Sequence, residues 1–106
     1  MRKKWIYLLA LIICSIAFVS CGKIKSSFKH LVAEAAYNQG KYDKAIGLYK
    51  EIVADNPSNA QLRWNLGIAY YSKGDLLNAS RQAVELRKLG RKDLAQDLEQ
   101  VIERQK

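Results

Sequence analysis

Residues 64–75 read WNLGIAYYSKGD, a run of apolar and small residues that ends near a glycine. Sliding the sequence against itself by 34 residues places this run on residues 30–41. Identical residues then pair at five positions: Ala35 with Ala69, Tyr37 with Tyr71, Gly40 with Gly74, Ala45 with Ala79 and Glu51 with Glu85. A fixed period of this length is typical of proteins built from stacked units. The sequence therefore predicts two copies of one structural unit.

Each copy contains two apolar-periodic stretches separated by a glycine. Gly40 and Gly74 suit helix C-termini, because glycine has no Cβ atom that would clash in the left-handed backbone conformation found there. Pro57 ends the second helix of the first copy, and Ser58 or Asn59 is expected to cap the next helix. The pattern predicts helix, tight turn, helix. One face of that second helix is apolar at spacings of three and four: Ala45, Leu48, Tyr49, Ile52 and Val53.

These units resemble the tetratricopeptide repeat family. Small residues stand at the eighth and twentieth positions of each unit, an apolar residue at the twenty-seventh, and a proline near the end of the first: Ala33, Gly67, Ala45, Ala79, Ile52, Leu86 and Pro57. Ala36 departs from the pattern by replacing an aromatic residue, and Gly90-Arg91 replaces the closing proline region. The resemblance, which covers Ser26 to Asp93, implies an all-α, right-handed helix-turn-helix solenoid with repeats at 26–59 and 60–93.

A further helix is predicted at 94–106, with Asp93 as its cap. Its apolar stripe consists of Leu94, Leu98, Val101 and Ile102. Such a helix is expected to close the end of the solenoid, where a repeat would otherwise expose an apolar face. A docking role toward a second copy or a partner is the alternative. Two repeats fall short of the three or more usually needed for a stable stack, so the cap, dimerisation or a partner must supply the difference.

The first twenty residues have the layout of a signal peptide. Met1 to Lys4 is basic, Trp5 to Val19 is apolar apart from Cys14 and Ser15, and small residues follow. As a helix, this stretch of fifteen residues spans about 22 Å, less than the roughly 30 Å hydrocarbon core of a bilayer. An uncleaved membrane anchor with its basic end in the cytoplasm is the alternative.

Phe18-Val19-Ser20-Cys21 resembles the lipobox of bacterial lipoproteins, in which a small residue precedes an obligatory cysteine. The resemblance implies that residues 1–20 are removed by cleavage and that Cys21 becomes the new N-terminus. Cys21 would then carry a diacylglycerol and fatty acyl chains of the palmitate type. Residues 21–25 would then be a short tether, and the protein would lie at the periplasmic face of the inner or outer membrane of the cell envelope. Cys14 follows two isoleucines and is expected to be ordinary apolar filling.

Composition argues against catalysis and against metal or cofactor chemistry. Hydrophobic residues make up 49% and charged residues 26% of the 106-residue chain, as in a small globular domain. His30 is the only histidine and has no nucleophile at motif spacing, and the six glycines form no phosphate-binding loop. The formal charge is +8, but removal of the leader leaves fifteen basic and ten acidic residues. The sequence predicts a protein that is not an enzyme and needs no cofactor.

Two candidate binding surfaces remain. The family resemblance places positions five, six, nine, twelve and thirteen of each unit in a concave groove: His30, Leu31, Glu34, Tyr37 and Asn38, then Trp64, Asn65, Ile68, Tyr71 and Ser72. Trp64 and Tyr71 lie two turns apart and are candidate anchors for a ligand, unless one of them packs between repeats. His30 and Glu34 do not match the carboxylate clamp of chaperone-binding relatives. The second surface is a basic patch that contains Arg81, Arg87, Lys88, Arg91 and Lys92.

The basic patch is expected to be a solvated surface or to attract anionic headgroups or an acidic partner, and nucleic acid is not expected for an exported protein. Taken together, the sequence predicts a membrane-anchored scaffold or assembly factor that binds protein partners of an envelope complex. The alternatives are an uncleaved, signal-anchored subunit of a secretion or division apparatus, and a periplasmic holdase for exported clients. A holdase would bind many unfolded chains weakly, whereas a scaffold would bind one or two partners well.

Overall fold

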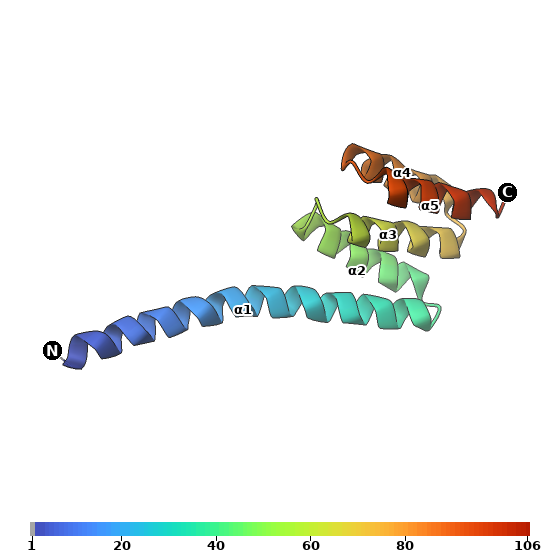
Figure 1. Cartoon of the computed structure of the whole chain (residues 1–106). Helices are drawn as coiled ribbons and strands as arrows, with labels where there is room; N and C mark the ends of the chain where they lie inside the picture. The colour runs from blue at the N-terminus through green and yellow to red at the C-terminus, as the bar shows by residue number, and fades with distance from the viewer. Residues whose placement is uncertain (1) are drawn as a thin grey trace.

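The computed structural model describes the backbone of residues 2–106 and the side chains of residues 3–13 and 27–106. The described chain is made of α1 (Arg2–Asn38), α2 (Tyr42–Asp55), α3 (Ala60–Lys73), α4 (Leu76–Lys88) and α5 (Lys92–Glu103). Each helix packs on the next, and α5 also packs on α3 (Figure 1). This arrangement confirms the predicted all-α helical solenoid.

Glycine turns join α1 to α2, α3 to α4 and α4 to α5. Gly40, Gly74 and Gly90 have φ angles of 76°, 89° and 79°, which are in the left-handed region. At each turn two backbone N–H groups return to carbonyls of the preceding helix, as in Gly74 to Tyr71 and Asp75 to Tyr70, both at 2.9 Å. Carbonyls at the helix ends thus gain partners without a side chain. The predicted turns at the first two glycines are confirmed.

The connection between α2 and α3 is different, because it passes through Pro57 and is closed by a side chain. Asn59 Oδ1 accepts a hydrogen bond from the backbone N–H of Leu62 at 3.2 Å, so the predicted cap is confirmed at Asn59. Asp75 caps α4 in the same way through the N–H of Asn78. These side chains accept hydrogen bonds from N–H groups of the first helical turn, which have no carbonyl partner within the helix.

The predicted cap of the last helix at Asp93 is wrong. The N-cap of α5 is Arg91, which has no side-chain cap bond, and Asp93 lies in the first helical turn. The Gly90 turn explains the shift, because the Arg91 N–H bonds back to the carbonyl of Leu86 at 2.9 Å and starts the new helix at once. Asp93 instead accepts two hydrogen bonds from the Arg91 guanidinium at 3.1 and 3.0 Å.

Helix α1 is longer than either expected N-terminal element. It runs without a break from Arg2 to Asn38, so the expected tether at 21–25 is helical and is continuous with the first helix of the first repeat. No proline interrupts this part of the sequence. In Figure 1 the N-terminal half of α1 projects away from the other helices. The side chain of Cys21 lies outside the described residues.

Residues 5–13 of α1 are exposed and apolar around the whole circumference of the helix. Exposed side chains here are Trp5, Ile6, Tyr7, Leu8, Leu9, Leu11, Ile12 and Ile13. None of the helices, searched over the described residues, is both long and apolar enough to cross a membrane.

Two hydrophobic clusters form the core of the repeats, and α3 contributes to both. The first joins α1, α2 and α3 through Ala33, Ala36, Ala45, Ile46, Tyr49, Ile52, Val53, Leu62, Leu66 and Ala69. The second joins α3, α4 and α5 through Ala60, Ala79, Ala83, Leu86, Ala95, Leu98 and Ile102. Alanine is frequent in both because helix axes that cross closely leave no room for longer side chains. Leu98 and Ile102 confirm the predicted apolar stripe of the last helix.

Gly67 sets how closely α5 approaches α3. A Cβ atom built on Gly67 would lie 2.5 Å from Leu98 Cδ2, 3.2 Å from Leu98 Cδ1 and 3.3 Å from Gln82 Cβ. Leu98 is fully buried and therefore has little freedom to withdraw. Gly47 is also in a helix, but a Cβ atom built on it meets nothing within 4 Å.

We expect alanine to have opposite effects at these two helical glycines. Gly47→Ala should raise the free energy of unfolding by up to about 1 kcal/mol, since alanine is the better helix former. Gly67→Ala should lower it, because overpacking a filled core costs about 1–3 kcal/mol and exceeds that gain. Urea titration of the helical circular dichroism signal measures both values. Leu98→Val should recover part of the loss in the Gly67→Ala chain, and a stabilised Gly67→Ala variant would contradict the close approach.

Candidate functional site

A concave groove of about 200 Å³ opens between α1, α2 and α3. Its lining residues are Glu34, Tyr37 and Asn38 from α1, Tyr49 from α2, and Trp64, Asn65 and Ile68 from α3. The structure thus brings six of the ten predicted groove residues into one depression: Glu34, Tyr37, Asn38, Trp64, Asn65 and Ile68. Leu31 does not line the groove and is exposed on another side of α1. They meet because the first helices of the two repeats lie on the same side of the stack. The arrangement combines aromatic, aliphatic and amide groups around a single carboxylate.

His30 lies at one end of this groove and links it to a neighbouring cavity. The Asn65 amide Nδ2 and His30 Nε2 form a hydrogen bond of 3.4 Å, and His30 Nδ1 lies 4.0 Å from a carboxylate oxygen of Glu34. The imidazole and the ring of Tyr49 pack in a T-shaped arrangement, with the two ring centroids 6.0 Å apart. The neighbouring cavity, of about 330 Å³, is lined by Ser27, His30, Ile52, Asn56, Asn59, Gln61 and Leu62.

A chain of amide groups runs along α3 between the two cavities. Gln61 Nε2 donates to Asn65 Oδ1 at 3.2 Å, and the other end of the Asn65 amide donates to His30. Asn56, which also lines the second cavity, donates from Nδ2 to the carbonyl oxygen of Ile52 at 3.1 Å. Because an amide side chain offers both a donor and an acceptor, such a surface matches the main chain of a peptide better than it matches an ion.

Tyr49 was not predicted as a groove residue. It belongs to the apolar stripe of α2 and is only 4% exposed, so the sequence pattern assigns it to the core. Burial, with smaller effects from the Glu34 carboxylate and from Tyr37, raises the pKa of Tyr49 above its usual value. Its hydroxyl therefore stays protonated at neutral pH and can donate a hydrogen bond. Its position at the groove follows from the gap between α1 and α3, which no sequence spacing reveals.

Tyr37 ties the two sides of the groove together. Its hydroxyl and the Ser72 hydroxyl, on α1 and α3 respectively, form a hydrogen bond of 2.8 Å. Its ring packs against Tyr42 at the start of α2, with ring centroids 5.4 Å apart. Lys73 and Asp43 form an ion pair between α3 and α2 at the same end of the helices. These contacts hold α1, α2 and α3 in a fixed relation at one end of the depression.

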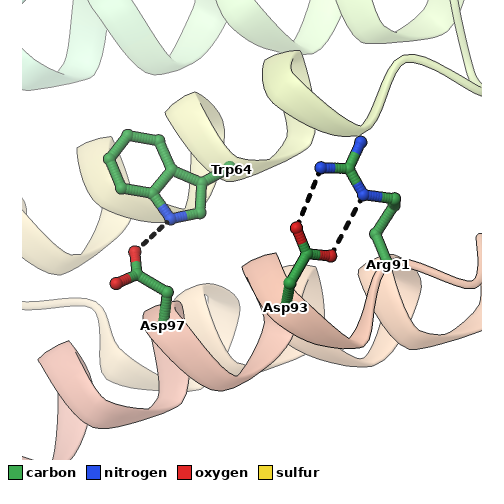
Figure 2. A network of polar contacts seen from close by, with 4 residues as sticks. All are labelled: Trp64, Arg91, Asp93 and Asp97. Carbon is green, nitrogen blue, oxygen red and sulfur yellow. Dashed lines mark hydrogen bonds and ion pairs between the residues drawn. The ribbon is translucent and has the colours of Figure 1, made fainter.

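The two aromatic residues proposed as anchors lie in different surroundings. Trp64 lines the groove, but its indole Nε1 donates to Asp97 Oδ2 of α5 at 2.8 Å (Figure 2). Tyr71 is partly buried against the second hydrophobic cluster and does not line the groove. Trp64 therefore acts as a wall between the groove and α5, and Tyr71 packs between the second repeat and the last helix.

Most residues of the basic patch have polar partners. Arg87 of α4 donates two hydrogen bonds to the Glu99 carboxylate of α5, at 3.0 and 2.7 Å. Lys88 pairs with Glu85 at 3.1 Å, and Arg81 donates to Asn78 at 3.3 Å. Arg91 forms the bidentate pair with Asp93 that Figure 2 shows beside Trp64 and Asp97, whereas Lys92 is exposed. Paired charges weaken the field that this surface presents to an anionic ligand.

Residues 32–86 match the family model described as tetratricopeptide repeat. The chain belongs to the tetratricopeptide repeat family. A comparison with curated proteins finds no match. Membership in the family gives the chain a role in protein–protein interaction, and members are generally scaffolds without catalytic activity. The described residues also contain no group of three or more histidine, cysteine or acidic side chains that could hold a metal ion.

The Arg87–Glu99 pair predicts an acid-dependent part of stability. Hydrogen bonds from Arg87 hold the pKa of the Glu99 carboxyl below its usual value of about 4.3. The folded protein then binds fewer protons than the unfolded chain in this range, so stability falls as pH drops from about 4.3 through the lower folded pKa. Glu99→Gln should flatten part of this fall in the thermal unfolding midpoint, measured by circular dichroism from pH 6 to 3.

Arg87→Ala should flatten the same part of the curve, and the double variant should show no further change. A Glu99→Gln profile that runs parallel to that of the unmodified chain would contradict the pairing.

Proposed function

We propose that this protein is a membrane-anchored scaffold that holds a segment of another cell-envelope protein in the groove between α1 and α3. The observation that carries the proposal is the gathering of Tyr37, Trp64 and Ile68 with the amides of Asn38 and Asn65 in one depression. Aromatic and aliphatic walls can take up an apolar side chain, and amides can pair with the peptide main chain. This combination suits an extended or helical peptide segment.

The charge in the groove narrows the kind of segment expected. Glu34 is the only charged side chain among its lining residues, and no lysine or arginine is present to bind a terminal carboxylate. A segment that is neutral or carries one basic residue near an apolar side chain therefore fits best. An acidic segment would meet Glu34 without a compensating cation.

A photoreactive side chain at the groove rim tests this role. We expect p-benzoylphenylalanine at exposed Asn38 to give one dominant adduct in living cells, identified by mass spectrometry. The same group at Lys50, which is exposed on α2 outside the groove lining, serves as the matched control and should give none. Asn65→Arg should reduce the Asn38 adduct about tenfold by filling the groove, after circular dichroism has confirmed the fold.

Other outcomes would contradict the scaffold. An adduct that forms equally at both sites, or that persists with Asn65→Arg, would move the interaction away from the groove. Many weak adducts with unrelated exported proteins would favour a holdase.

The proposed anchor is a lipid on Cys21. The support is the sequence Phe18-Val19-Ser20-Cys21 after an apolar stretch, together with the all-round apolar surface of α1 near its N-terminus. Several acyl chains would hold the domain stably at a membrane, where one chain would bind only reversibly. An uncleaved N-terminal helix is the rival anchor, and it would place the same repeats beside the inner membrane.

Metabolic labelling with a palmitate analogue separates the two anchors. We expect the label to be incorporated into the unmodified chain and into Cys14→Ser, and to be lost in Cys21→Ala. The Cys21→Ala chain should also retain its first twenty residues, as seen by its larger mass. Labelling that survives Cys21→Ala, or membrane attachment without any label, would reject the lipoprotein assignment.

A further inference from the structure

The side of α1 that faces away from the repeats carries a bare apolar stripe. Phe28 and Leu31 are 65% and 62% exposed, and Ala35 next along the stripe is also exposed. At about 100° per residue these positions lie on one side of the helix, opposite the fully buried Ala33. We call Phe28, Leu31 and Ala35 the α1 stripe.

The spacing of the α1 stripe is that of a helix-pairing seam. Its residues are three and then four apart, and in the sequence the same alternation continues backward to Ile24 and Cys21. Apolar residues at this spacing allow two helices to pack along their length. The stripe is flanked by polar residues, with Ser27 and Glu34 on one side and Gln39 on the other. Around residues 5–13, in contrast, apolar side chains cover the whole circumference, which is the pattern expected next to lipid.

The two ends of the helix stack differ in polarity, and this difference indicates which surface can pair with the α1 stripe. The exposed face of α5 is polar and carries Gln96, Asp97, Gln100, Glu103 and Arg104. The apolar end of one copy therefore has no complementary surface at the far end of another copy, and head-to-tail stacking is disfavoured. An apolar stripe of this kind matches the same stripe on a second copy, and such an isologous contact closes after two subunits.

We propose that two copies of this protein pair through their α1 stripes, with the helices parallel and in register. The parallel direction rests on the proposed N-terminal anchor, because both copies would leave the same membrane in the same direction. The pairing itself does not depend on the groove, whose lining residues Tyr37 and Trp64 lie away from the stripe. Two turns of seam are weak in solution, but anchoring to one membrane raises the effective concentration of the second helix.

Site-directed disulfide formation in membranes tests the proposal on the full chain. The background is Cys14→Ser, with Cys21 kept, and the background chain without an added cysteine is the blank. We expect Phe28→Cys and Leu31→Cys each to form covalent dimers at least tenfold more than Leu77→Cys after mild oxidation. Leu77 on α4 is a matched control, since it is an equally exposed leucine at 66%.

A second substitution separates specific pairing from collision. Leu31→Glu should lower the dimer yield of Phe28→Cys about tenfold, because it places two carboxylates face to face in the seam. Leu77→Glu should leave that yield unchanged. Because both positions are exposed, neither substitution should reduce the helical circular dichroism signal.

Three results would overturn the proposal. Equal dimer yields at positions 28, 31 and 77 would show random collision. Monomers whose added cysteines at 28 and 31 resist a membrane-impermeant thiol reagent would show that the stripe lies against lipid. Monomers whose cysteines react fully would show a bare face. The two proposals can also fail separately. If the photoreactive group at Asn38 gives no adduct while Leu31→Cys still forms covalent dimers, the proposed function is rejected and the pairing is retained.

Discussion

The close contact between Gly67 of α3 and Leu98 of α5 is the constraint on which the second half of the structure depends. Helix α3 contributes to both hydrophobic clusters, so it must accept neighbours on two sides. On the first side it offers Leu62 and Leu66 to α1 and α2. On the second side there is no room for a side chain at position 67, and the missing Cβ lets Leu98 reach the backbone. Without that approach α5 could not cover the second cluster.

The same approach shapes the groove. When α5 is seated by Leu98, its Asp97 is within hydrogen-bond distance of the Trp64 indole, 2.8 Å away. Trp64 is then held at the boundary between the groove and the last helix. Packing in the second repeat is therefore coupled to the surface that the first repeat presents to a partner. A substitution that unseats α5 is expected to change binding without touching any residue of α1.

Much of this fold follows from the sequence because it depends on short-range patterns. The glycines at helix ends and the cap at Asn59 each act within a few residues, and both are confirmed. The family resemblance predicted the groove, and six of its predicted residues line one depression because equivalent positions of stacked helices face the same side. The match of residues 32–86 to the family model agrees with this prediction.

The features that sequence reasoning missed depend on contacts between distant residues or on competing local bonds. Tyr49 has the spacing of a core residue, and only the gap between α1 and α3 makes it part of the groove. Asp93 has the chemistry of a cap, but the Gly90 turn begins α5 at Lys92 and leaves Asp93 to pair with Arg91. The Arg87–Glu99 pair joins α4 to α5, so a count of basic residues along the chain overstates the free charge.

The two ends of the repeat stack are finished in different ways, and this difference bears on how a chain with only two repeats remains stable. At the C-terminal end, α5 buries Ala95, Leu98 and Ile102 and turns a polar face outward. At the N-terminal end, α1 buries Ala33 and Ala36 but leaves Phe28 and Leu31 exposed. This exposed apolar surface is on α1, the helix that also carries the apolar N-terminal segment. A membrane anchor on that helix would bring the exposed apolar faces of two copies together at high effective concentration. One helix can therefore supply both membrane attachment and a packing partner for the N-terminal end of the stack.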